Sequence, residues 1–557
     1  MGATSGDDDP LIHARAFLAV HRSDIGTVVV YAAAVGVLVL ATPVAVQSLV
    51  STVAFGTVLQ PIVVLATLLL GGLVFAGVLR ALKSRAVEML QRRMFVRAAA
   101  ELAFRLPRTS ADVRVAYPIH RFFDLFSAQK SASTLLLGGV DVVLSASVGM
   151  LVLAFYHPLL LAFALGLLVS LLLLVFVAGR RGVATSIDES SAKLALSDLL
   201  ADITQTPYTF RDERGRSYAR AQIDALAQQY LRARASHFRI VMRQIGGGIA
   251  LQAVASAALL GLGGWLVIQR ELTLGQLVAA ELIVSAVLLS LSDLGKYAET
   301  YYDLVASLYK LDGILTLPLE EDEAAGSLDV RGAPCEVLFE QVHMSRGERV
   351  LLDGASHRFP AGARVLLRGT PGSGKTSLLE LLFGLHRQDR GRVLVDGVDT
   401  RELSRGALRA RIALVRGPEI VAGTVLENVR LGDPTIAPGT VRALLDRLGL
   451  GEELGHLPRG LDTPLGVHGE RISDGQAWRL TLARALVRAP GLVAIDVDAS
   501  AILDAESWRR SLQVLTSADA PWTLVLVGEQ PEARAMCGQV VWIEEGRLVE
   551  EVTRAAG

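Results

Sequence analysis

Hydrophobic positions form six long uninterrupted runs in the first part of the chain and only short alternating runs after it. The six runs cover residues 27–52, 58–80, 133–155, 158–180, 245–269 and 274–296. A helix needs about 20 apolar residues to cross roughly 30 Å of hydrocarbon. Each run meets that length, so the pattern predicts six membrane-spanning helices.

The six runs fall into three pairs. Links within a pair are a few residues long, as at Tyr156–Pro158 and Arg270–Thr273, whereas the links between pairs run from Ala81 to Ala132 and from Arg181 to Ile245. Both long links are rich in Lys and Arg, which places them in the cytoplasm by the positive-inside rule. The short turns are then external, and we expect both termini to be cytoplasmic.

The long links also carry helical patterns. Val87–Arg105 and Ser190–Ile203 are rich in Ala, Leu, Arg and Glu and lack internal Pro, which favours helices that continue well beyond the bilayer. A proline interrupts each stretch in the segments near 107–118 and 205–214. These segments are expected to be short elements that contact the rest of the protein or, alternatively, solvated turns.

Two acids, Asp141 and Glu281, fall inside the apolar runs. A charge within the bilayer costs about 2.5–3.5 kcal/mol on insertion scales, so such a residue tends to face a cavity or a partner. Both acids are candidates for lining a translocation path, and a packed or interfacial position is the alternative. No substrate can be inferred from them.

Composition agrees with a membrane protein. The 557-residue chain is 51% hydrophobic with a mean hydropathy of +0.43, which is high for a wholly soluble protein. Net charge is −1 and no Lys/Arg-rich block stands apart, so we expect no nucleic-acid partner. Cys335 and Cys537 match neither a zinc pattern nor a disulfide framework and are expected to be inert thiols. The abundance of Ala, Leu, Val and Arg suggests a bacterial source, hence the bacterial inner membrane.

The pattern changes after Pro318. An acidic stretch, Glu320–Glu323, leads into short β-branched runs that alternate with helical patterns, which is typical of an α/β domain with a parallel sheet. The sequence therefore predicts a multidomain membrane protein. An all-α six-helix transmembrane domain (1–316) is joined by a linker (317–334) to an α/β domain (335–557).

A glycine-rich loop lies between a predicted strand, Arg364–Arg368, and a predicted helix, Ser377–Leu385. This is the context that a P-loop requires. Its glycines let backbone N–H groups close on phosphates, Lys375 reaches the β and γ oxygens, and Thr376 offers its hydroxyl to Mg²⁺. The candidate ATP contacts are Gly369, Thr370, Pro371, Gly372, Ser373, Gly374, Lys375, Thr376 and Ser377.

A second run, Leu492–Asp496, is an apolar strand that ends in an acid. P-loop ATPases hold Mg²⁺ beside the phosphates with such an acid, although any buried strand can end in Asp. Between the P-loop and this strand lies Ile472–Gln476, followed by a helical stretch, Ala477–Val487. We assign Asp496 and Thr376 as the candidate metal ligands.

Here the chain resembles ATP-binding-cassette exporters. Ile472–Gln476 is close to the family's Leu-Ser-Gly-Gly-Gln signature and stands in the family's order. Six paired spans before such a cassette match the plan of an exporter half-transporter, so the resemblance covers nearly the whole chain. In that family two cassettes pair head to tail, which implies that Ser473, Gly475 and Gln476 contact the ATP held by the partner. Asp474 replaces a glycine and adds negative charge near a phosphate.

The sequence departs from the family at several functional positions. Val497 stands where the family has its catalytic glutamate, Arg416 where it has the coupling glutamine, and Glu529 where it has the histidine. Arg346 falls at the position of the adenine-stacking aromatic, and a guanidinium plane can still stack on a base. Val467 replaces a usual glutamate before the signature.

These departures predict that the chain's own P-loop site binds ATP and hydrolyses it poorly. General-base catalysis typically contributes about 10²- to 10⁴-fold, and no residue here is assigned as catalytic. Asp498 is a substitute base to consider, but on a strand it would point to the opposite face from residue 497. Glu529 and Arg416 have an alternative role as a structural ion pair across the site.

The leading hypothesis is one subunit of a heterodimeric exporter, an ATP-hydrolysing translocase only as an assembly. This chain would hold ATP and Mg²⁺ at its own P-loop and supply its signature to an active half-transporter partner. A slow homodimeric exporter and a non-transporting membrane protein switched by ATP binding are the alternatives. The short external turns argue against a receptor. The N-terminal segment before the first run has no room for a peptidase domain, and the transported substrate cannot be deduced.

Overall fold

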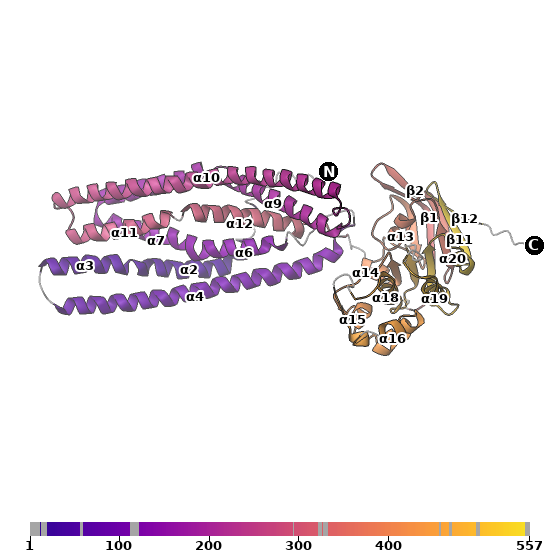
Figure 1. Cartoon of the computed structure of the whole chain (residues 1–557). Coiled ribbons are helices and arrows are strands. Elements are labelled where there is room, and N and C mark those ends of the chain that lie inside the picture. The colour runs from indigo at the N-terminus through magenta and orange to yellow at the C-terminus, as the bar shows by residue number, and fades with distance from the viewer. Residues whose placement is uncertain are drawn as a thin grey trace, which may run out of the picture. The chain divides into compact units, whose positions relative to one another are not determined.

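The computed structural model forms two compact units, Met1–Leu319 and Glu320–Gly557. The division falls inside the linker expected at 317–334. Figure 1 shows that the first unit is built of helices and that the second contains the strands. The structure describes residues 12, 19–55, 59–111, 122–292, 294–320, 326, 332–455, 458–466, 471–496 and 502–551.

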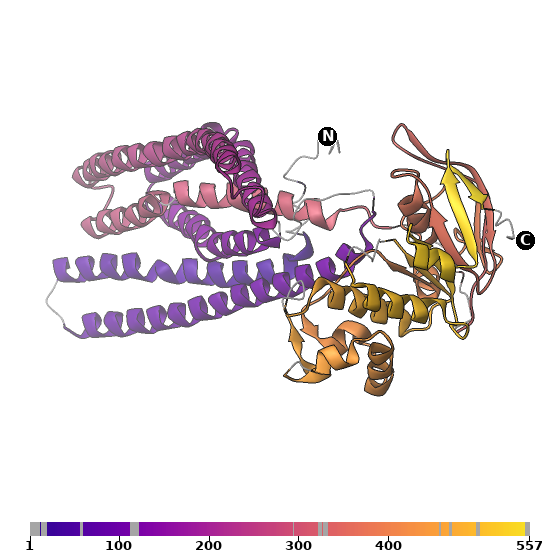
Figure 2. The same ribbon diagram turned by 45° about the vertical axis from the view of Figure 1, so that its right-hand side comes forward.

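The helical unit has long helices that lie side by side in both views (Figure 1, Figure 2). Two of its segments, η2 and η3, are single π-helical turns, and η1 is a 3₁₀ turn. The elements are α2 (Arg22–Val39), α3 (Ala41–Phe55), α4 (Leu59–Arg105), η1 (Leu106–Arg108), α6 (Asp124–Thr134), η2 (Leu135–Gly139), α7 (Val140–Tyr156), α8 (Pro158–Leu173), η3 (Leu174–Ala178), α9 (Gly182–Gln205), α10 (Glu213–Ile268), α11 (Leu274–Ser292) and α12 (Leu294–Leu315).

Five helical segments in the described part of the chain are long and apolar enough to cross a membrane. A sixth apolar segment, Leu274–Ala286 of α11, is shorter. Each of the six predicted runs overlaps one of these segments. The five are Arg22–Thr52, Gln60–Arg108, Asp124–Tyr156, Pro158–Ala178 and Glu213–Ile268.

Helices α4 and α10 are much longer than a bilayer crossing requires. They contain 47 and 56 residues, and at 1.5 Å per residue each exceeds about 70 Å, more than twice the hydrocarbon thickness. Both therefore continue beyond the membrane, as expected from the helical patterns in the long links. Helix α4 ends just before Pro107 and α9 ends two residues before Pro207.

The two expected capping elements have different outcomes. Residues 207–212 form turns and bends, which is the alternative that the sequence left open, so the second excursion closes through a turn. The first element begins with the 3₁₀ turn Leu106–Arg108, while residues 112–121 lie outside the described residues. Proline at 107 and at 207 explains both stops, since it removes a backbone donor and clashes with the preceding helical turn.

The two described short turns at the far end of the bundle meet each other. His157 Nε2 lies 3.0 Å from Glu271 Oε2, which joins the turn between α7 and α8 to the turn between α10 and α11. His157 also caps α8 by accepting a hydrogen bond from the Leu159 N–H. Beneath these turns Leu153, Leu160 and their neighbours form a buried apolar cluster with α10. The ion pair and the apolar packing therefore hold these short turns in place.

The second unit contains a six-stranded sheet with strand order β12-β11-β3-β10-β9-β6, in which the neighbours from β11 to β6 are parallel. A four-stranded antiparallel sheet has the order β2-β1-β4-β5. The strands are β1 (Val337–Arg346), β2 (Arg349–Phe359), β3 (Arg364–Arg368), β4 (Arg390–Val395), β5 (Val398–Asp399), β6 (Ile412–Val415), β7 (Gly423–Thr424), β8 (Pro464–Leu465), β9 (Leu492–Ile495), β10 (Thr523–Val527), β11 (Gln539–Glu544) and β12 (Arg547–Glu550).

Both faces of the parallel sheet are covered. Along β9, Leu492 and Ala494 join the core on one face, while Val493 and Ile495 join the core on the other, as the two-residue period of a strand requires. This explains why the strand reads as a continuous apolar run. The helices are α13 (Lys375–Leu382), α14 (Arg405–Arg411), α15 (Val425–Arg430), α16 (Pro438–Arg447), α17 (Gly451–Gly455), η4 (Gly460–Asp462), α18 (Asp474–Leu486), α19 (Ala505–Thr516) and α20 (Pro531–Met536).

The two cysteines belong to the second unit and are buried with free thiols. Burial raises the pKa of Cys335 to about 12 and that of Cys537 to about 11. A thiolate is the reactive form of cysteine. Both thiols therefore have the properties of the inert residues expected from the sequence.

Candidate nucleotide site

The parallel strands bring the predicted site residues to one edge of the sheet. The P-loop follows β3, Arg416 follows β6, Asp496 follows β9 and Glu529 lies just beyond β10. Val415 pairs with Ile495 in the register of β6 and β9, and the Asp496 N–H donates to the Val415 carbonyl at 2.8 Å. Arg416 and Asp496 are therefore held next to each other, at the strand ends where α/β proteins bind ligands.

Glycine is required at three positions of the P-loop. Gly369, Gly372 and Gly374 have φ values of +153°, +83° and +104°, a region that other residues rarely adopt. A Cβ on Gly374 would lie 2.9 Å from the Leu351 carbonyl oxygen. The loop thus has the tight conformation that lets backbone amides face a phosphate, and α13 begins directly after it.

The side chains of the P-loop fit a phosphate ligand. Lys375 Nζ donates to the carbonyls of Gly369 at 2.6 Å and Thr370 at 3.0 Å, so the ammonium group lies over the loop. Ser373 Oγ is buried and has no hydrogen-bond partner among the described residues. A phosphate oxygen would satisfy this hydroxyl. The structure therefore brings together the lysine, the glycines and the hydroxyl that the sequence singled out for ATP.

Two of the oxygen atoms expected to hold Mg²⁺ converge. The Thr376 hydroxyl, at the start of α13, donates to Asp496 Oδ1 at 3.2 Å. Burial raises the pKa of Asp496 above its ordinary value, and the Thr376 hydroxyl and Arg416 oppose this effect. Mg²⁺ typically takes one or two protein ligands together with substrate phosphates and water. This pair fits that role, and the ion would neutralise charge between phosphate oxygens.

A cation occupies the position where the resemblance places a neutral glutamine. Arg416 Nη1 lies 2.9 Å from Glu380 Oε1, and Arg416 Nε lies 3.6 Å from Asp496 Oδ2. The ion pair between Arg416 and Glu529, the alternative considered from the sequence, is not formed. Glu529 is exposed, and within the described ranges no ion pair joins it to another residue.

Glu380 on α13 was not anticipated from the sequence. Its carboxylate is buried and lies 3.3 Å from His386 Nε2 and 3.7 Å from Arg346 Nη1, in addition to Arg416. Arg346 Nη2 and His386 Nε2 are 2.8 Å apart. We name these four residues the Glu380 cluster. The signal that the sequence reasoning missed is an acid inside the apolar stretch of the P-loop helix.

Other predicted residues have mixed outcomes. Arg346 lies at the end of β1 and is drawn into the Glu380 cluster, so its stacking on adenine stays a prediction. Val497, Asp498 and Val467 lie outside the described residues, and their roles also stay predictions. Within the described ranges, no group of three His, Cys, Asp or Glu residues could hold a metal ion.

The signature segment forms the N-terminus of α18. Ser473 Oγ accepts from the Gln476 N–H at 3.2 Å, and the Ser473 N–H donates to Gln476 Oε1 at 3.0 Å, a reciprocal capping box. Gln476 Nε2 also donates to Glu453 at 2.9 Å. Ser473 and Asp474 are exposed. The segment therefore presents a pre-formed helix start, with one acid at the position where an anion would bind.

The two acids of the apolar runs differ in their surroundings. Asp141 forms an ion pair with Lys83 of α4, with Lys83 Nζ 2.5 Å from Asp141 Oδ2 and 2.8 Å from the Leu137 carbonyl. This favours the packed alternative for Asp141. Glu281 accepts a hydrogen bond from Ser285 at 3.2 Å, and its Oε2 is buried without a partner among the described residues. A place for Glu281 on a translocation path stays a prediction.

Comparisons with known proteins agree with this geometry. A family model described as "ABC transporter" matches residues 352–497. Over 414 residues the chain is 30% identical to "Mycobactin import ATP-binding/permease protein IrtB" of Mycolicibacterium thermoresistibile, covering 73% of this chain and 70% of the relative. Over 264 residues it is 32% identical to "Glutathione/L-cysteine transport system ATP-binding/permease protein CydD" of Escherichia coli, covering 47% of this chain and 44% of the relative.

A solved structure shares the fold. The bacterial Atm1-family ABC exporter with ATP bound superposes with a TM-score of 0.78 at 22% identity, covering 96% of this chain and 95% of that chain. The fold is therefore of the Atm1 exporter type, with a helical membrane domain fused to an α/β nucleotide-binding domain. This agrees with the fold class predicted from the sequence.

Proposed function

The chain belongs to the ABC transporter family of ATP-binding/permease proteins, and on that premise we propose a specific role for it. It holds ATP at its own P-loop with little hydrolysis and completes the hydrolytic site of an active partner half-transporter. The observation that carries the proposal is Arg416, which lies between Glu380 and Asp496 where a neutral coupling residue would contact metal and water.

Two features support ATP binding without turnover. The P-loop keeps Lys375, its three glycines of positive φ and the Thr376–Asp496 pair. The sequence lacks a carboxylate at Val497, and Arg416 is a guanidinium that stays protonated and cannot accept a proton from water. Binding groups are retained while base and relay groups are absent, which favours a site that clamps nucleotide.

The signature supports a partner of different sequence. Ser473 and Gln476 form their capping box in this chain alone, so the surface that would meet the partner's ATP is already ordered. Two sites lacking a base would give a homodimer no means of rapid hydrolysis. A heterodimer in which the partner carries the intact base makes use of both features.

The proposed assembly is an ATP-hydrolysing translocase in the inner membrane of a bacterium. Six spans cross the lipid bilayer, both termini are cytoplasmic, and ATP is bound with Mg²⁺. Outward transport is proposed from the exporter fold. The substrate is unassigned and no nucleic-acid partner is proposed. A slow homodimeric exporter and an ATP-switched membrane protein that does not transport are the two competing functions.

The test is ATP binding and hydrolysis by the purified chain, reconstituted alone in lipid. We expect binding that is lost in Lys375→Ala, with hydrolysis near the background of that variant. Val497→Glu adds the missing carboxylate and Asp498→Asn removes the substitute one. Robust hydrolysis in the native chain that disappears in Asp498→Asn would overturn the proposal and favour the self-sufficient homodimer.

A further inference from the structure

We propose that Arg416 supplies part of the positive charge that Mg²⁺ supplies at an ordinary P-loop site, so that ATP binding to this chain depends only weakly on Mg²⁺. This inference rests on the proposed function, because it concerns the same nucleotide site. It adds an explanation of how the site balances the negative charge of bound ATP.

The position of Arg416 is set by the sheet. Strands β6 and β9 are neighbours in register, so the residues that directly follow them, Arg416 and Asp496, lie side by side. Arg416 Nε is 3.6 Å from Asp496 Oδ2, while the other oxygen of the same carboxylate accepts from Thr376 at 3.2 Å. Asp496 therefore contacts both Thr376, the other expected metal ligand, and Arg416, which is permanently charged.

Glu380 holds the guanidinium in this place. It contacts Arg416 through Oε1 at 2.9 Å and is itself buried, whereas Arg416 remains partly open to solvent. His386 and Arg346 approach its other oxygen, Oε2, at 3.3 and 3.7 Å. Arg416 is therefore anchored by a residue of the P-loop helix, rather than free to swing into solvent.

The electrostatic consequence has two parts. A guanidinium beside Asp496 neutralises the carboxylate that would attract a divalent ion, and its own charge repels that ion. The same charge, together with Lys375, favours the phosphates of a nucleotide bound at this edge. Arg is suited to this role because it stays protonated and presents several donors in a fixed plane.

The experiment measures binding of the fluorescent analogue mant-ATP to the purified full chain in lipid nanodiscs, with Mg²⁺ or with EDTA. In the native chain we expect the dissociation constant to change by less than about threefold between the two conditions. In Arg416→Gln we expect EDTA to weaken binding by at least about tenfold. Arg416→Lys keeps a charge without the planar fork and should lie between them.

The outcomes separate the two proposals. If EDTA weakens binding to the native chain as much as to Arg416→Gln, the role of Arg416 is overturned. If binding survives EDTA but the native chain hydrolyses ATP rapidly with Mg²⁺, the proposed function fails and this inference stands. If the native chain binds mant-ATP in neither condition, both are overturned.

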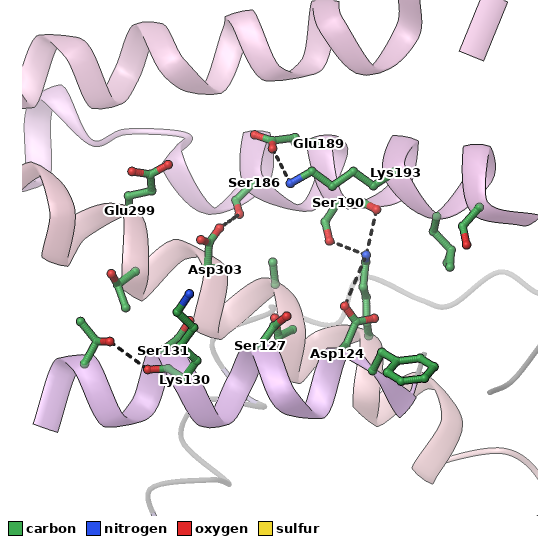
Figure 3. A pocket seen from close by; sticks show the side chains of 18 of the residues that line it. Asp124, Ser127, Lys130, Ser131, Ser186, Glu189, Ser190, Lys193, Glu299 and Asp303 are labelled. Atoms are coloured by element: carbon green, nitrogen blue, oxygen red, sulfur yellow. Dashed lines mark hydrogen bonds and ion pairs between the residues drawn. The ribbon is translucent and has the colours of Figure 1, made fainter. Parts of the chain in front are cut away.

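A second inference comes from an independent feature, a cavity of about 690 Å³ in the helical unit between α6, α9 and α12 (Figure 3). Lysines, carboxylates and hydroxyls dominate its lining. The charged residues that line it are Asp124, Lys130, Glu189, Lys193, Lys296, Glu299, Asp303 and Lys310.

The carboxylates of this cavity are already engaged. Glu189 lies 2.7 Å from Lys193 and 3.2 Å from Arg234, which also lies 3.4 Å from Glu299. Figure 3 shows Asp303 turned toward Ser186, whose hydroxyl donates to it at 3.1 Å. The negative charge of these carboxylates is therefore partly neutralised by neighbouring cations and a hydroxyl.

Asp124 is engaged as well, because Lys310 Nζ lies 4.0 Å from Asp124 Oδ1 and donates to the Ser190 carbonyl at 2.9 Å. Burial raises the pKa of Asp303 above its ordinary value, although the hydrogen bond from Ser186 lowers it. The pairing of Asp124 and the raised pKa of Asp303 both lower the negative charge that a solute in the cavity would meet.

Two lysines of the lining are not paired with an acid in the described part of the chain. Lys130 and Lys296 line the cavity, are exposed, and have no ion pair with a carboxylate among the described residues. Ser131 and Ser307 also line it from buried positions. Ammonium and hydroxyl groups together form the donor set that binds carboxylate or phosphate.

We infer that this cavity admits an organic anion from the cytoplasmic side. The test does not need the solute itself, because a cysteine in the cavity can report its charge preference. Ser127→Cys places a thiol on an exposed lining position, and the native Cys335 and Cys537 are buried. The probes are the methanethiosulfonate reagents MTSES, which is anionic, and MTSET, which is cationic.

Rates are divided by those of free cysteine with the same reagent. We expect the cavity to favour MTSES over MTSET by about threefold or more after this correction, and the preference to vanish when Lys130→Ala and Lys296→Ala are added. Ser191→Cys, on the same helix as much of the lining but outside it, should show no preference. Equal rates, faster MTSET, or no labelling of Ser127→Cys would overturn the inference.

Discussion

The two units of this protein each place a basic residue against an aspartate that the sequence marked for function, and the two pairs differ in exposure. In the helical unit the Lys83 side chain is 3% exposed and that of Asp141 is 30% exposed. In the second unit Asp496 is 9% exposed, but its partner Arg416 is 44% exposed. A cation sealed inside a bundle serves packing, whereas one that reaches solvent at a sheet edge can also meet a ligand.

The largest expected effect tests the sealed pair. Lys83→Met leaves the partly buried Asp141 without its cation, and the cost of breaking a fully buried pair, about 3–5 kcal/mol, is the upper limit of the loss. The loss should appear as a lower thermal unfolding midpoint of the purified protein in detergent. Lys83→Met with Asp141→Leu removes both charges and should recover most of the midpoint. If the single variant keeps the native midpoint, the pair is not structural.

The next effect is on chemistry at the open pair. Val497→Glu combined with Arg416→Gln restores both a carboxylate and a neutral coupling residue, and we expect ATP hydrolysis by the chain alone to rise about 10²-fold. Phosphate release measures it. Val497→Gln with Arg416→Gln has nearly the same shape without a base and should stay at the native rate. Unchanged hydrolysis in the first variant, with ATP still bound, would mean that other groups limit turnover.

The sequence predicted the parts of this comparison that depend on local signals. The spans followed from apolar length, and the P-loop followed from glycines between a strand and a helix. The contacts of these side chains could not be predicted, because Lys83 and Asp141 are 58 residues apart, and Arg416 and the acid that anchors it, Glu380, are 36 apart. Which residue meets which depends on how helices pack and on strand order, neither of which is written in a local pattern.

The same limit explains how two open alternatives were decided. An ion pair between Arg416 and Glu529 was one of them, but β10 and β6 are separated by β9 in the sheet. Glu380 lies on α13, which follows the P-loop, and it is this acid that contacts Arg416. Residues 207–212 form a turn because Pro207 disfavours helix before it and Asp212 caps α10 after it.

A smaller effect is expected on stability at the open pair. Arg416→Gln removes a half-exposed cation, and pairs of that kind contribute roughly 0–1 kcal/mol. The unfolding midpoint should therefore change much less than in Lys83→Met, measured by the same method. Glu380→Gln is the matched control, because this buried acid contacts two guanidinium groups and an imidazole and its loss should cost more. A loss in Arg416→Gln as large as in Lys83→Met would remove the distinction between sealed and open pairs.

A third pair is close in exposure to the sealed pair, and it gives the smallest effect because only the pH-dependent part of its contribution is measured. In the second unit Arg479 is 5% exposed and Glu453 is 37% exposed, with Arg479 Nη1 2.8 Å from Glu453 Oε1.

Burial would raise the pKa of Glu453, but hydrogen bonds from Arg479 and Gln476 outweigh it, and the folded pKa is lowered from 4.5. A carboxylate whose pKa falls on folding stabilises the folded state above its unfolded pKa, and this stability is lost as pH falls through the lowered value. We therefore expect the native protein to lose up to about 1 kcal/mol more than Glu453→Gln between pH 7 and the region below pH 4.5. Chemical unfolding of both proteins across that range measures the difference. Parallel pH curves would show that Glu453 adds nothing, although its partner Arg479 is about as buried as Lys83.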